Sequence, residues 1–358
     1  MSLSIGIIGL PNVGKSTLFK ALTKKQVNIS AYPFCTINPN IGVVEVPDER
    51  LDKLAEVLKP KKIIPATIRF IDIAGLVKNA HQGEGLGNQF LSHIREVTAI
   101  CHLVRIFRDE KVSRLTEKIG PKEDVEIVNL ELIFADLDTT ERKLEALKKK
   151  AKTDQGKTIL QNIAVLEKIK IGLEMGKMVY DLELTEEEKE LIKELNLLTL
   201  KPVLYVLNID ELQIGKEIKY QLPFINYLPI CAKLESELAD LPALEAQEYV
   251  KELNLKTFGL DQFIKACYQL LDLITFFTCQ NNILQAWTLP KGNVIIKAAA
   301  KVHTDFAQGF VKADVINWQK FIEAGSEHKA YAKGWIHTEG KDYLVEDGDV
   351  IRFKFKAS

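Results

Sequence analysis

The sequence predicts an α/β fold in which a mainly parallel sheet is interrupted by a pair of long helices and followed by a small β-rich domain. Three observations predict it. Apolar runs of strand length recur through the first 210 residues, and a helical heptad pattern separates the third run from the fourth. From about residue 276 the apolar runs become short. With 358 residues, 46% of them hydrophobic, the chain can bury large cores and is long enough for two or three domains.

Four apolar runs are predicted to be buried parallel strands, because they have the length and the β-branched content typical of such strands. They are LSIGIIGL (3–10), ATIRFIDIAGL (66–76), TAICHLVRIF (98–107) and KPVLYVLNID (201–210). The first run leads into a glycine turn and then into a helical pattern, KSTLFKALTKK, at residues 15–25.

Between the third and fourth runs the sequence predicts an antiparallel helical hairpin inserted into the α/β domain. A first series of apolar residues follows a heptad, with two neighbours beside it: Leu130, Leu137 and Leu144, with Ile133 and Leu147. After the break at TDQGK a second series follows: Ile159, Ile163, Leu166 and Leu173. The alternative is two ordinary amphipathic helices that lie on the sheet.

From residue 276 the apolar runs become short, as in NVIIKAAAKVH at residues 293–303. In KDYLVEDGDVIRFKF, residues 341–355, the Asp347-Gly348 pair is flanked by alternating residues, which predicts a β-hairpin. Residues 276–358 are therefore expected to form a small β-rich domain.

The bulk composition excludes several classes of protein. The 48 Lys and Arg against 49 Asp and Glu give a net charge of -1, so any nucleic-acid surface has to be local. The odd count of five cysteines, without a Cys-x-x-Cys pair, argues against a complete disulfide framework and favours a reducing compartment. No stretch approaches the roughly 18 apolar residues of a membrane helix, and no basic leader precedes an apolar run. We expect a soluble cytoplasmic protein with no membrane partner.

The strongest chemical signal is GLPNVGKST, residues 9–17, which fits the phosphate-binding pattern G-x-x-x-x-G-K-[ST] between a strand and a helix. The glycines let successive backbone N–H groups point at phosphate oxygens, and the helix adds its positive end. Lys15 is expected to neutralise the outer phosphates during catalysis, and Ser16 to place a hydroxyl on Mg²⁺. The nucleotide-contacting residues predicted here are Asn12, Val13, Gly14, Lys15, Ser16 and Thr17.

A second element fits the first. FIDIAG, residues 70–75, places Asp72 at the end of an apolar strand, where it can order the water shell of Mg²⁺, and the Gly75 N–H can sense the terminal phosphate. Thr36, in YPFCTINPNIG at residues 32–42, is the candidate that completes the metal shell, or else a plain loop threonine.

Several segments of the chain resemble the YchF-type, Obg-related P-loop ATPases of the TRAFAC class. They are GLPNVGKSTLF, YPFCTINPNIG, DIAGLVKNAHQGEGLGNQFL, KVHTDFAQGFVKADVINW and EGKDYLVEDGDV, and they span nearly the whole chain. The resemblance implies a nucleotide domain at 1–125 and 199–275, a helical coiled-coil insertion at 126–198 and a TGS domain with a β-grasp fold at 276–358. It also implies a ribosome-associated, translation-factor-class protein that hydrolyses ATP in preference to GTP.

The base-binding residues support that preference. Guanine readers carry Asn-Lys-x-Asp, whereas this chain reads Asn208-Ile209-Asp210-Glu211. The longer Glu211 displaces the carboxylate that would clasp guanine, which by analogy with bidentate base readout forfeits roughly 1–3 kcal/mol of guanine preference. Ile209 lacks the lysine charge over the base, and Asn208 can reach the base or brace the P-loop. A second loop, PICAKLESEL, is expected to close the other side of the base through Cys231, Ala232 and Lys233. Both segments could instead be surface loops.

The residue that positions the hydrolytic water is open. Leu76 stands where many guanine-type switch proteins place a glutamine, and Arg114-Leu115 stands where the family usually carries a His-Val pair. Three hypotheses follow: Arg114 stabilises charge instead, His81 approaches the phosphate, or turnover is very slow without a partner.

Two segments could contact RNA. RKLEALKKKAK, residues 142–152, concentrates positive charge near the predicted hairpin tip, although such a run can also be a solvated helix face. The β-rich tail carries three tryptophans that could stack on bases or lie in the core: Trp287, Trp318 and Trp335. Neither segment shows a base-reading code, so RNA binding is expected to follow backbone and shape.

Functions of different classes remain open from the residues alone. The first is a slow, partner-regulated ATPase, monomeric and cytoplasmic, that binds the large subunit or the whole ribosome in translation or stress regulation. The second is a ribosome- or RNA-binding module in which the nucleotide is a structural ligand. A third is a GTP-dependent ribosome assembly factor of the wider Obg class. No motif indicates the ribosomal state bound, the process regulated or the oligomeric state.

Overall fold

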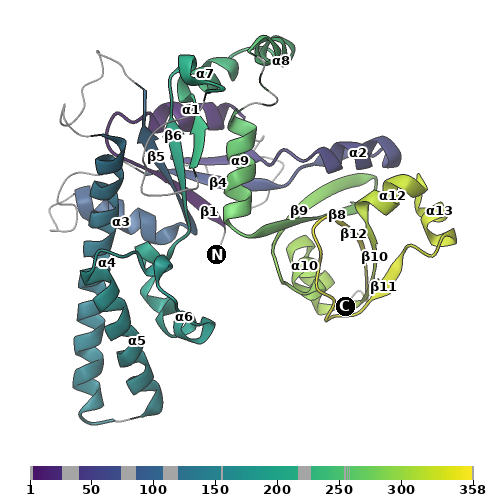
Figure 1. Ribbon diagram of the computed structural model, residues 1–358. Coiled ribbons are helices and arrows are strands. Elements are labelled where there is room, and N and C mark those ends of the chain that lie inside the picture. The colour runs from purple at the N-terminus through teal and green to yellow at the C-terminus, as the bar shows by residue number, and fades with distance from the viewer. Residues whose placement is uncertain are drawn as a thin grey trace. The chain divides into compact units, whose positions relative to one another are not determined.

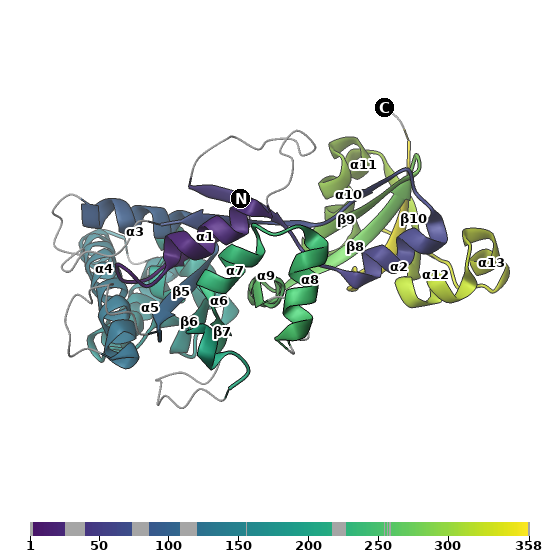
Figure 2. The same cartoon turned by 90° about the horizontal axis from the view of Figure 1, so that it is seen from above.

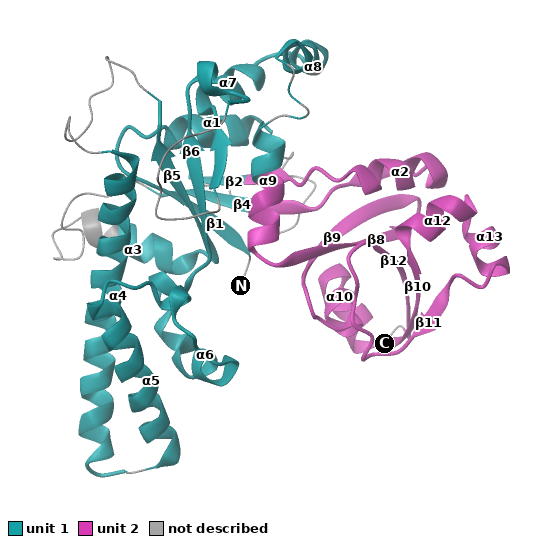
Figure 3. Ribbon diagram, viewed as in Figure 1, with its two compact units in different colours: residues 1–42, 69–263 teal, residues 43–68, 264–358 magenta. Residues whose placement is uncertain are grey.

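The computed structural model describes residues 3–25, 40–73, 86–107, 120–154, 156–216, 227–253, 255, 257 and 259–356. They form two compact units, coloured separately in Figure 3. Unit 1 comprises Met1–Gly42 and Arg69–Phe263, and unit 2 comprises Val43–Ile68 and Ile264–Ser358. Within the described ranges, no helix combines the length and the apolar content that crossing a bilayer requires.

The sheet of unit 1 has the strand order β2-β4-β1-β5-β6-β7, and every neighbouring pair from β4 to β7 is parallel. Its strands are β1 (Ser4–Ile8), β2 (Ile41–Glu45), β4 (Thr67–Asp72), β5 (Ala99–Arg105), β6 (Val203–Asn208) and β7 (Tyr227–Ile230). All residues of β1 and β5 are buried, as expected for central strands covered on both faces. The four predicted strands are therefore confirmed.

Helices α1 (Lys15–Lys24) and α3 (Leu86–Glu96) connect strands of this sheet, and α7 (Ala232–Leu238), α8 (Ala243–Glu252) and α9 (Gly259–Leu270) follow its last strand (Figures 1 and 2). Helix α9 crosses the boundary between the two units, after Phe263. The short 3₁₀ turns η5 (Leu198–Leu200) and η6 (Glu211–Gln213) precede and follow β6. Because the strands are parallel, their carboxyl ends meet at one edge, where ligands bind in open α/β sheets. The residues that follow β1, β4, β5 and β6 are thus brought together.

The predicted helical hairpin consists of α4 (Pro121–Ala151) and α5 (Lys157–Glu174), which run side by side in Figure 1. They are antiparallel, because Lys148 pairs with Glu167 at 2.7 Å and Lys170 pairs with Glu141 at 2.8 Å. After α5 come η3 (Val179–Asp181), α6 (Glu186–Ile192) and η4 (Lys193–Leu195). Helix α4 starts at a proline in its first position, with Glu123 and Asp124 in the first turn, a favourable N-terminus.

The apolar seam of the hairpin contains most of the predicted heptad residues. Leu144, Leu166 and Leu173 are buried in it, with Leu137 partly buried beside them. Leu130 is 45% exposed and lies outside the seam. The pairing of two helices is therefore confirmed, whereas coiled-coil geometry stays a prediction.

Unit 2 is built on a mixed sheet with the order β11-β10-β12-β8-β9-β3. Its strands are β3 (Lys62–Ile64), β8 (Leu273–Gln280), β9 (Ile283–Pro290), β10 (Phe310–Asn317), β11 (His337–Glu339) and β12 (Asp349–Phe355). Its helices are α2 (Glu49–Leu58), α10 (Ile295–Val302), α11 (Thr304–Gln308), α12 (Trp318–Ala324) and α13 (Glu327–Ala332). Strand β12 is parallel to β8, and the pairs on either side of these two strands, β8–β9 and β10–β12, are antiparallel, as in a β-grasp sheet.

Helices cover both faces of this sheet. In Figure 2, α10 and α11 lie on one side of β8, β9 and β10, and α2 and α12 lie on the other. Phe276 faces the α10 side and belongs to the core that α10 completes. Its neighbour Phe277 lies under the guanidinium of Arg50 from α2, 5.5 Å from the ring centre. Residues 43–68 therefore belong to the same packed body as the C-terminal residues, while the domain boundaries given above stay a prediction.

One short apolar run of the tail is a helix, and one expectation for the tail is wrong. NVIIKAAAKVH contains helix α10, because its apolar residues follow a helical period and bury Ile295, Ala298 and Ala299 against the sheet. The hairpin expected around Asp347-Gly348 is absent from the described tail, since β12 pairs with β10 and β8 instead. Asp347 accepts from the Thr275 N–H at 2.8 Å, which ties the turn to the start of β8.

Candidate functional site

The loop between β1 and α1 has the backbone of a phosphate cradle. Gly9 has φ 151°, Asn12 has φ 63° and Gly14 has φ 98°. A Cβ on Gly9 would lie 2.5 Å from the carbonyl oxygen of Leu103, and one on Gly14 would overlap the side-chain amide of Asn208. Both positions therefore require glycine. The exposed N-terminus of α1 then presents N–H groups without intrahelical partners, the arrangement that binds phosphate.

Lys15 begins α1 and is only 8% exposed. Its ammonium donates to the carbonyl oxygens of Gly9 and Leu10 at 2.9 and 2.8 Å. Burial lowers its pKa to about 8, and the opposing attraction of Asp72 only partly offsets this. Because an ammonium has three donors, one more acceptor can be taken without breaking these bonds.

Three polar groups predicted to act on Mg²⁺ or phosphate are described beside Lys15. Ser16 and Thr17 are exposed in the first turn of α1. Asp72 ends β4, next to β1 in the sheet, and burial raises its pKa while Lys15 lowers it. The shared electrostatic interaction of Lys15 and Asp72 shows that the sheet brings these two groups together. A hydroxyl and a carboxylate are the hard oxygen donors that Mg²⁺ prefers, so this set fits the metal.

Asn208 fastens the cradle to the rest of the domain. It is 5% exposed at the end of β6. Its amide nitrogen donates to the carbonyl oxygen of Val13 at 2.9 Å, and its amide oxygen accepts from the N–H of Ala232 at 3.0 Å. Of the two roles open from the sequence, the structure therefore shows the brace, which joins the P-loop to the β7–α7 loop.

The other residues expected near the base divide into buried and exposed. Ile209, Cys231 and Ala232 are at most 6% exposed, and the first two pack in one apolar cluster. Ile209 donates its N–H to the carbonyl of Ile230 at 2.9 Å. Their burial gives these side chains a core role, and their contact with a base stays a prediction.

Glu211 lies at the surface, in η6. Its carboxylate is 3.1 Å from the ammonium of Lys233, and the two side chains are 46% and 73% exposed. The hydrogen bond to Glu211 raises the pKa of Lys233. Asp210 donates its N–H to the side chain of Gln213 at 2.9 Å, which fixes the register of this turn. The ion pair between Glu211 and Lys233 was not predicted from the sequence, which placed Lys233 only in the loop that closes the other side of the base.

His102 is a buried histidine near the P-loop that the sequence analysis did not identify as a site residue. It stands on β5 beside Ile8 of β1 and is 2% exposed. Burial, and secondly the charge of Lys15, lower its pKa to about 3. The imidazole is therefore neutral, so no second positive charge competes with Lys15. A histidine within an apolar strand was the signal that could have found it.

Several predicted residues lie outside the described residues. They are Thr36, Gly75, Leu76, His81 and Arg114. Their roles in metal binding and hydrolysis stay predictions.

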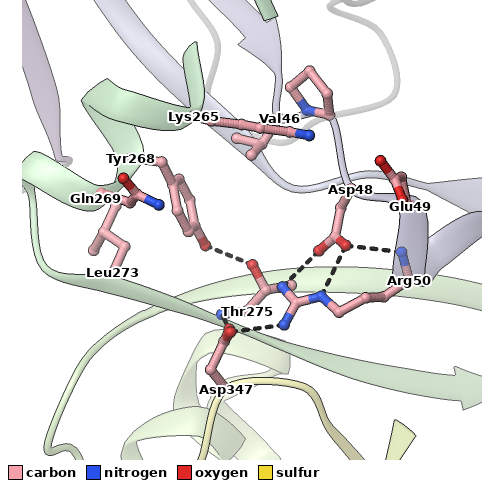
Figure 4. A pocket seen from close by; sticks show the side chains of 11 residues that line it. Val46, Asp48, Glu49, Arg50, Lys265, Tyr268, Gln269, Leu273, Thr275 and Asp347 are labelled. Carbon is pink, nitrogen blue, oxygen red and sulfur yellow. Dashed lines mark hydrogen bonds and ion pairs between the residues drawn. The ribbon is translucent and has the colours of Figure 1, made fainter. Parts of the chain in front are cut away.

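A cavity of about 300 Å³ lies within unit 2 (Figure 4). Arg50 lies across it, bonded to Asp48 at 2.8 Å and to Asp347 at 2.7 Å. Burial alone would lower the pKa of Arg50, but these two carboxylates raise it. Tyr268 bonds Thr275 at 2.9 Å on the opposite wall. These polar groups pair with one another, and the contacts of Arg50 with Asp347 and Phe277 hold α2 on the sheet.

Comparison with known proteins agrees with this architecture. A family model described as 50S ribosome-binding GTPase (MMR_HSR1) matches residues 4–135, and a second, YchF-GTPase_C, described as Protein of unknown function (DUF933), matches residues 273–356. The Ribosome-binding ATPase YchF of Bacillus subtilis (strain 168) is 45% identical over 365 aligned positions, covering 99% of this chain and 100% of the relative. The chain belongs to the YchF family.

Other YchF proteins give the same result. The Ribosome-binding ATPase YchF of Escherichia coli O157:H7 is 46% identical, with 99% of both chains covered. The solved structure of the Schizosaccharomyces pombe YchF GTPase matches with a TM-score of 0.88 at 36% identity, covering 99% of this chain and 98% of that one. The resemblance and the fold class drawn from the sequence are confirmed. These names differ on the base, since some YchF proteins are called ATPases and another a GTPase.

Proposed function

We propose that this chain is a ribosome-associated ATPase that binds ATP with Mg²⁺ at the P-loop and hydrolyses it slowly to ADP and phosphate. The observation that carries the proposal is the braced cradle: a phosphate loop with Lys15 inside it, tied by Asn208 to the base-side loop. The full-length relatives named ribosome-binding ATPases supply the partner.

The residues of the cradle have distinct roles in this proposal. Backbone N–H groups of residues 12–17 bind the phosphates, and Lys15 offers its remaining donor to the outer ones. With a pKa of about 8, Lys15 is mostly protonated at neutral pH, and the negative charge of a bound phosphate raises that pKa further. Lys15 thus neutralises charge that develops during phosphoryl transfer.

Mg²⁺ would be held by the Ser16 hydroxyl and, through water, by Asp72, with Thr36 as the third protein group. Bound there, the metal would supply charge neutralisation at the phosphates. The mutual attraction of Lys15 and Asp72 supports a site in which a cation and a carboxylate are both needed.

The preference for ATP rests on Glu211. Its carboxylate is longer than the aspartate of guanine readers and is paired with Lys233, so it is held by a competing cation. A guanine edge would have to displace that cation before it could bond the carboxylate in a bidentate manner. Adenine makes no such demand.

Hydrolysis requires a group that positions water. Gly75 would contact the terminal phosphate, and Arg114 or His81 would supply the replacement for the glutamine. Single-turnover ATP hydrolysis by Arg114→Ala and His81→Ala variants tests this, because a large loss in one identifies the group. Unchanged rates in both would leave only turnover that depends on a partner.

The partner proposed is the large subunit or the whole ribosome, contacted through RNA backbone and shape by a monomer in the cytoplasm. The decisive experiment is the ATPase rate with and without ribosomes, together with direct titration of ATP and GTP. Stimulation by ribosomes and tighter ATP binding support the proposal. Tighter GTP binding would favour an Obg-type GTP-dependent factor. If ribosome binding does not depend on the nucleotide and ribosomes do not stimulate the ATPase rate, the chain would instead be a ribosome-binding module in which the nucleotide is a structural ligand.

A further inference from the structure

The tip of the α4–α5 hairpin, defined as residues 141–157, differs from the rest of the chain in charge. It holds seven Lys or Arg and three Asp or Glu, a net charge of +4, whereas the whole chain carries -1. The remaining residues therefore carry -5. Lys149, Lys150, Lys152 and Lys157 are all exposed. The tip thus carries a local excess of positive charge on a chain that is otherwise net negative.

Other cations of the hairpin, among them Lys148 of the tip, are matched by carboxylates. Lys170 pairs with Glu141 at 2.8 Å, and Lys168 pairs with Glu188 at 3.1 Å. Lys149, Lys150 and Lys152 have no ion pair among the residues that the structure describes, and neither does Lys157. Their charge is available to a partner.

Helix stability does not account for this cluster. Lysines in the last turn of α4 do favour its C-terminus. Lys157, however, occupies the first position of α5, where a cation opposes the helix dipole. The first turn of α5 contains no acidic residue, and Gly156 provides no side-chain cap. Lys157 therefore costs α5 some stability, and unlike the lysines at the end of α4 it requires another explanation.

Polar contacts of α4 anchor the hairpin to the rest of unit 1. Asp136 on α4 is fully buried and accepts from the N–H groups of Leu198 and Thr199 at 3.0 and 2.7 Å, and from the Thr199 hydroxyl at 2.7 Å. Arg95, near the end of α3, donates to the Thr139 hydroxyl at 3.0 Å. At 1.5 Å per residue, the charged end of α4 extends about 21 Å beyond this joint.

We infer that the hairpin tip docks on the phosphate backbone of folded RNA. Several unpaired lysines close together can contact neighbouring phosphates, whereas a protein partner would need an apolar interface core. The tip has no aromatic residue for base stacking, and its Leu144 is buried inside the hairpin. The contact is therefore sequence-independent. This inference rests on the proposed ribosome association and assigns it a surface.

The test replaces the three exposed lysines Lys149, Lys150 and Lys152 with glutamine, which has a similar helix propensity. The matched control replaces Lys177, Lys251 and Lys291 in the same way; these exposed lysines lie outside the tip and also have no ion pair among the described residues. Both variants and the wild-type chain are titrated with ribosomes and with a short RNA duplex over a series of salt concentrations, and with ATP as a check of folding.

The tip variant is expected to lose about tenfold or more in affinity for ribosomes and RNA duplex, with the slope of log K against log salt reduced by about 2 to 3. The control and the ATP affinity should be unchanged. Equal losses in both variants, or wild-type slopes in the tip variant, would overturn the inference. So would weaker ribosome binding with undiminished duplex binding, because the tip would then contact ribosomal protein. A wild-type chain that does not bind ribosomes would instead refute the proposed function.

Discussion

The brace formed by Asn208 can be tested with an Asn208→Ala variant. The substitution removes the bond to the Val13 carbonyl, worth about 0.5–1.5 kcal/mol, and leaves the fully buried N–H of Ala232 without its acceptor, a cost of about 1–3 kcal/mol. The free energy of unfolding should therefore fall by roughly 2–4 kcal/mol. Without the brace, ATP binding would have to order one P-loop residue that the wild-type chain already holds in place. This ordering costs about 1–2 kcal/mol of binding free energy, which should weaken ATP binding about 5- to 30-fold.

Two further variants serve as comparisons. Asn208→Asp keeps an acceptor for Ala232 but places a buried carboxylate against the Val13 carbonyl oxygen, so it should weaken ATP binding and lose at least as much stability as Asn208→Ala. Asn129→Ala removes a single 3.4 Å bond to Tyr205 on the other side of β6 and should change neither quantity. Urea unfolding and ATP titration measure both. The reasoning is refuted if Asn208→Ala binds ATP as tightly as the wild-type chain, or if Asn129→Ala loses as much.

Three other predictions concern separate parts of the molecule. Glu211→Asp combined with Lys233→Met should raise the affinity for GTP relative to ATP about 5- to 100-fold, measured by titration, and an unchanged ratio with intact ATP binding would contradict the base assignment. Asp136→Ala should lower the free energy of unfolding by about 3–5 kcal/mol, whereas Asp138→Ala, at an exposed position, should lower it by less than about 0.5 kcal/mol. Similar losses in the two variants would show that the Asp136 hydrogen bonds do not anchor the hairpin. Burial is the main cause that raises the pKa of Asp349 to about 6. The protonated carboxyl therefore stabilises the folded state fully at pH values below the pKa of Asp349 in the unfolded chain, and this stabilisation is lost as the pH rises to 6. Relative to Asp349→Asn, the wild-type chain should therefore lose up to about 3 kcal/mol between pH 4 and 6; parallel curves in urea unfolding would disprove this.

Local patterns predicted the parts of the fold that short-range rules control. The strands at 4–8, 67–72, 99–105 and 203–208, the P-loop and the two hairpin helices follow from periodicity and from glycine positions that only glycine can occupy. Lys15 and Asp72 were found because parallel strands bring their carboxyl ends together.

The remainder depended on long-range contacts that no local pattern encodes. Asp347-Gly348 has the composition of a hairpin turn, but Arg50, 297 positions earlier, and Thr275 bind its carboxylate. Ile209 occupies the position of a base-covering lysine, yet the cluster around Leu207 and Leu234 buries it. An Ile209→Lys change would therefore bury a charge, so base preference is better tested at Glu211.

The grouping of residues 43–68 with the C-terminal residues has a consequence for synthesis of the chain. Strand β3 pairs with β9 from Lys62↔Ile283 to Ile64↔Gln285, so its partner emerges about 220 residues later. At about 5–20 residues per second, that delay is roughly 11–44 s, during which β3 and α2 have no sheet to join. A fragment that ends before residue 273 would leave them in that condition permanently. Truncation of the tail is thus expected to cause aggregation through an early segment, rather than to yield a clean nucleotide-binding domain.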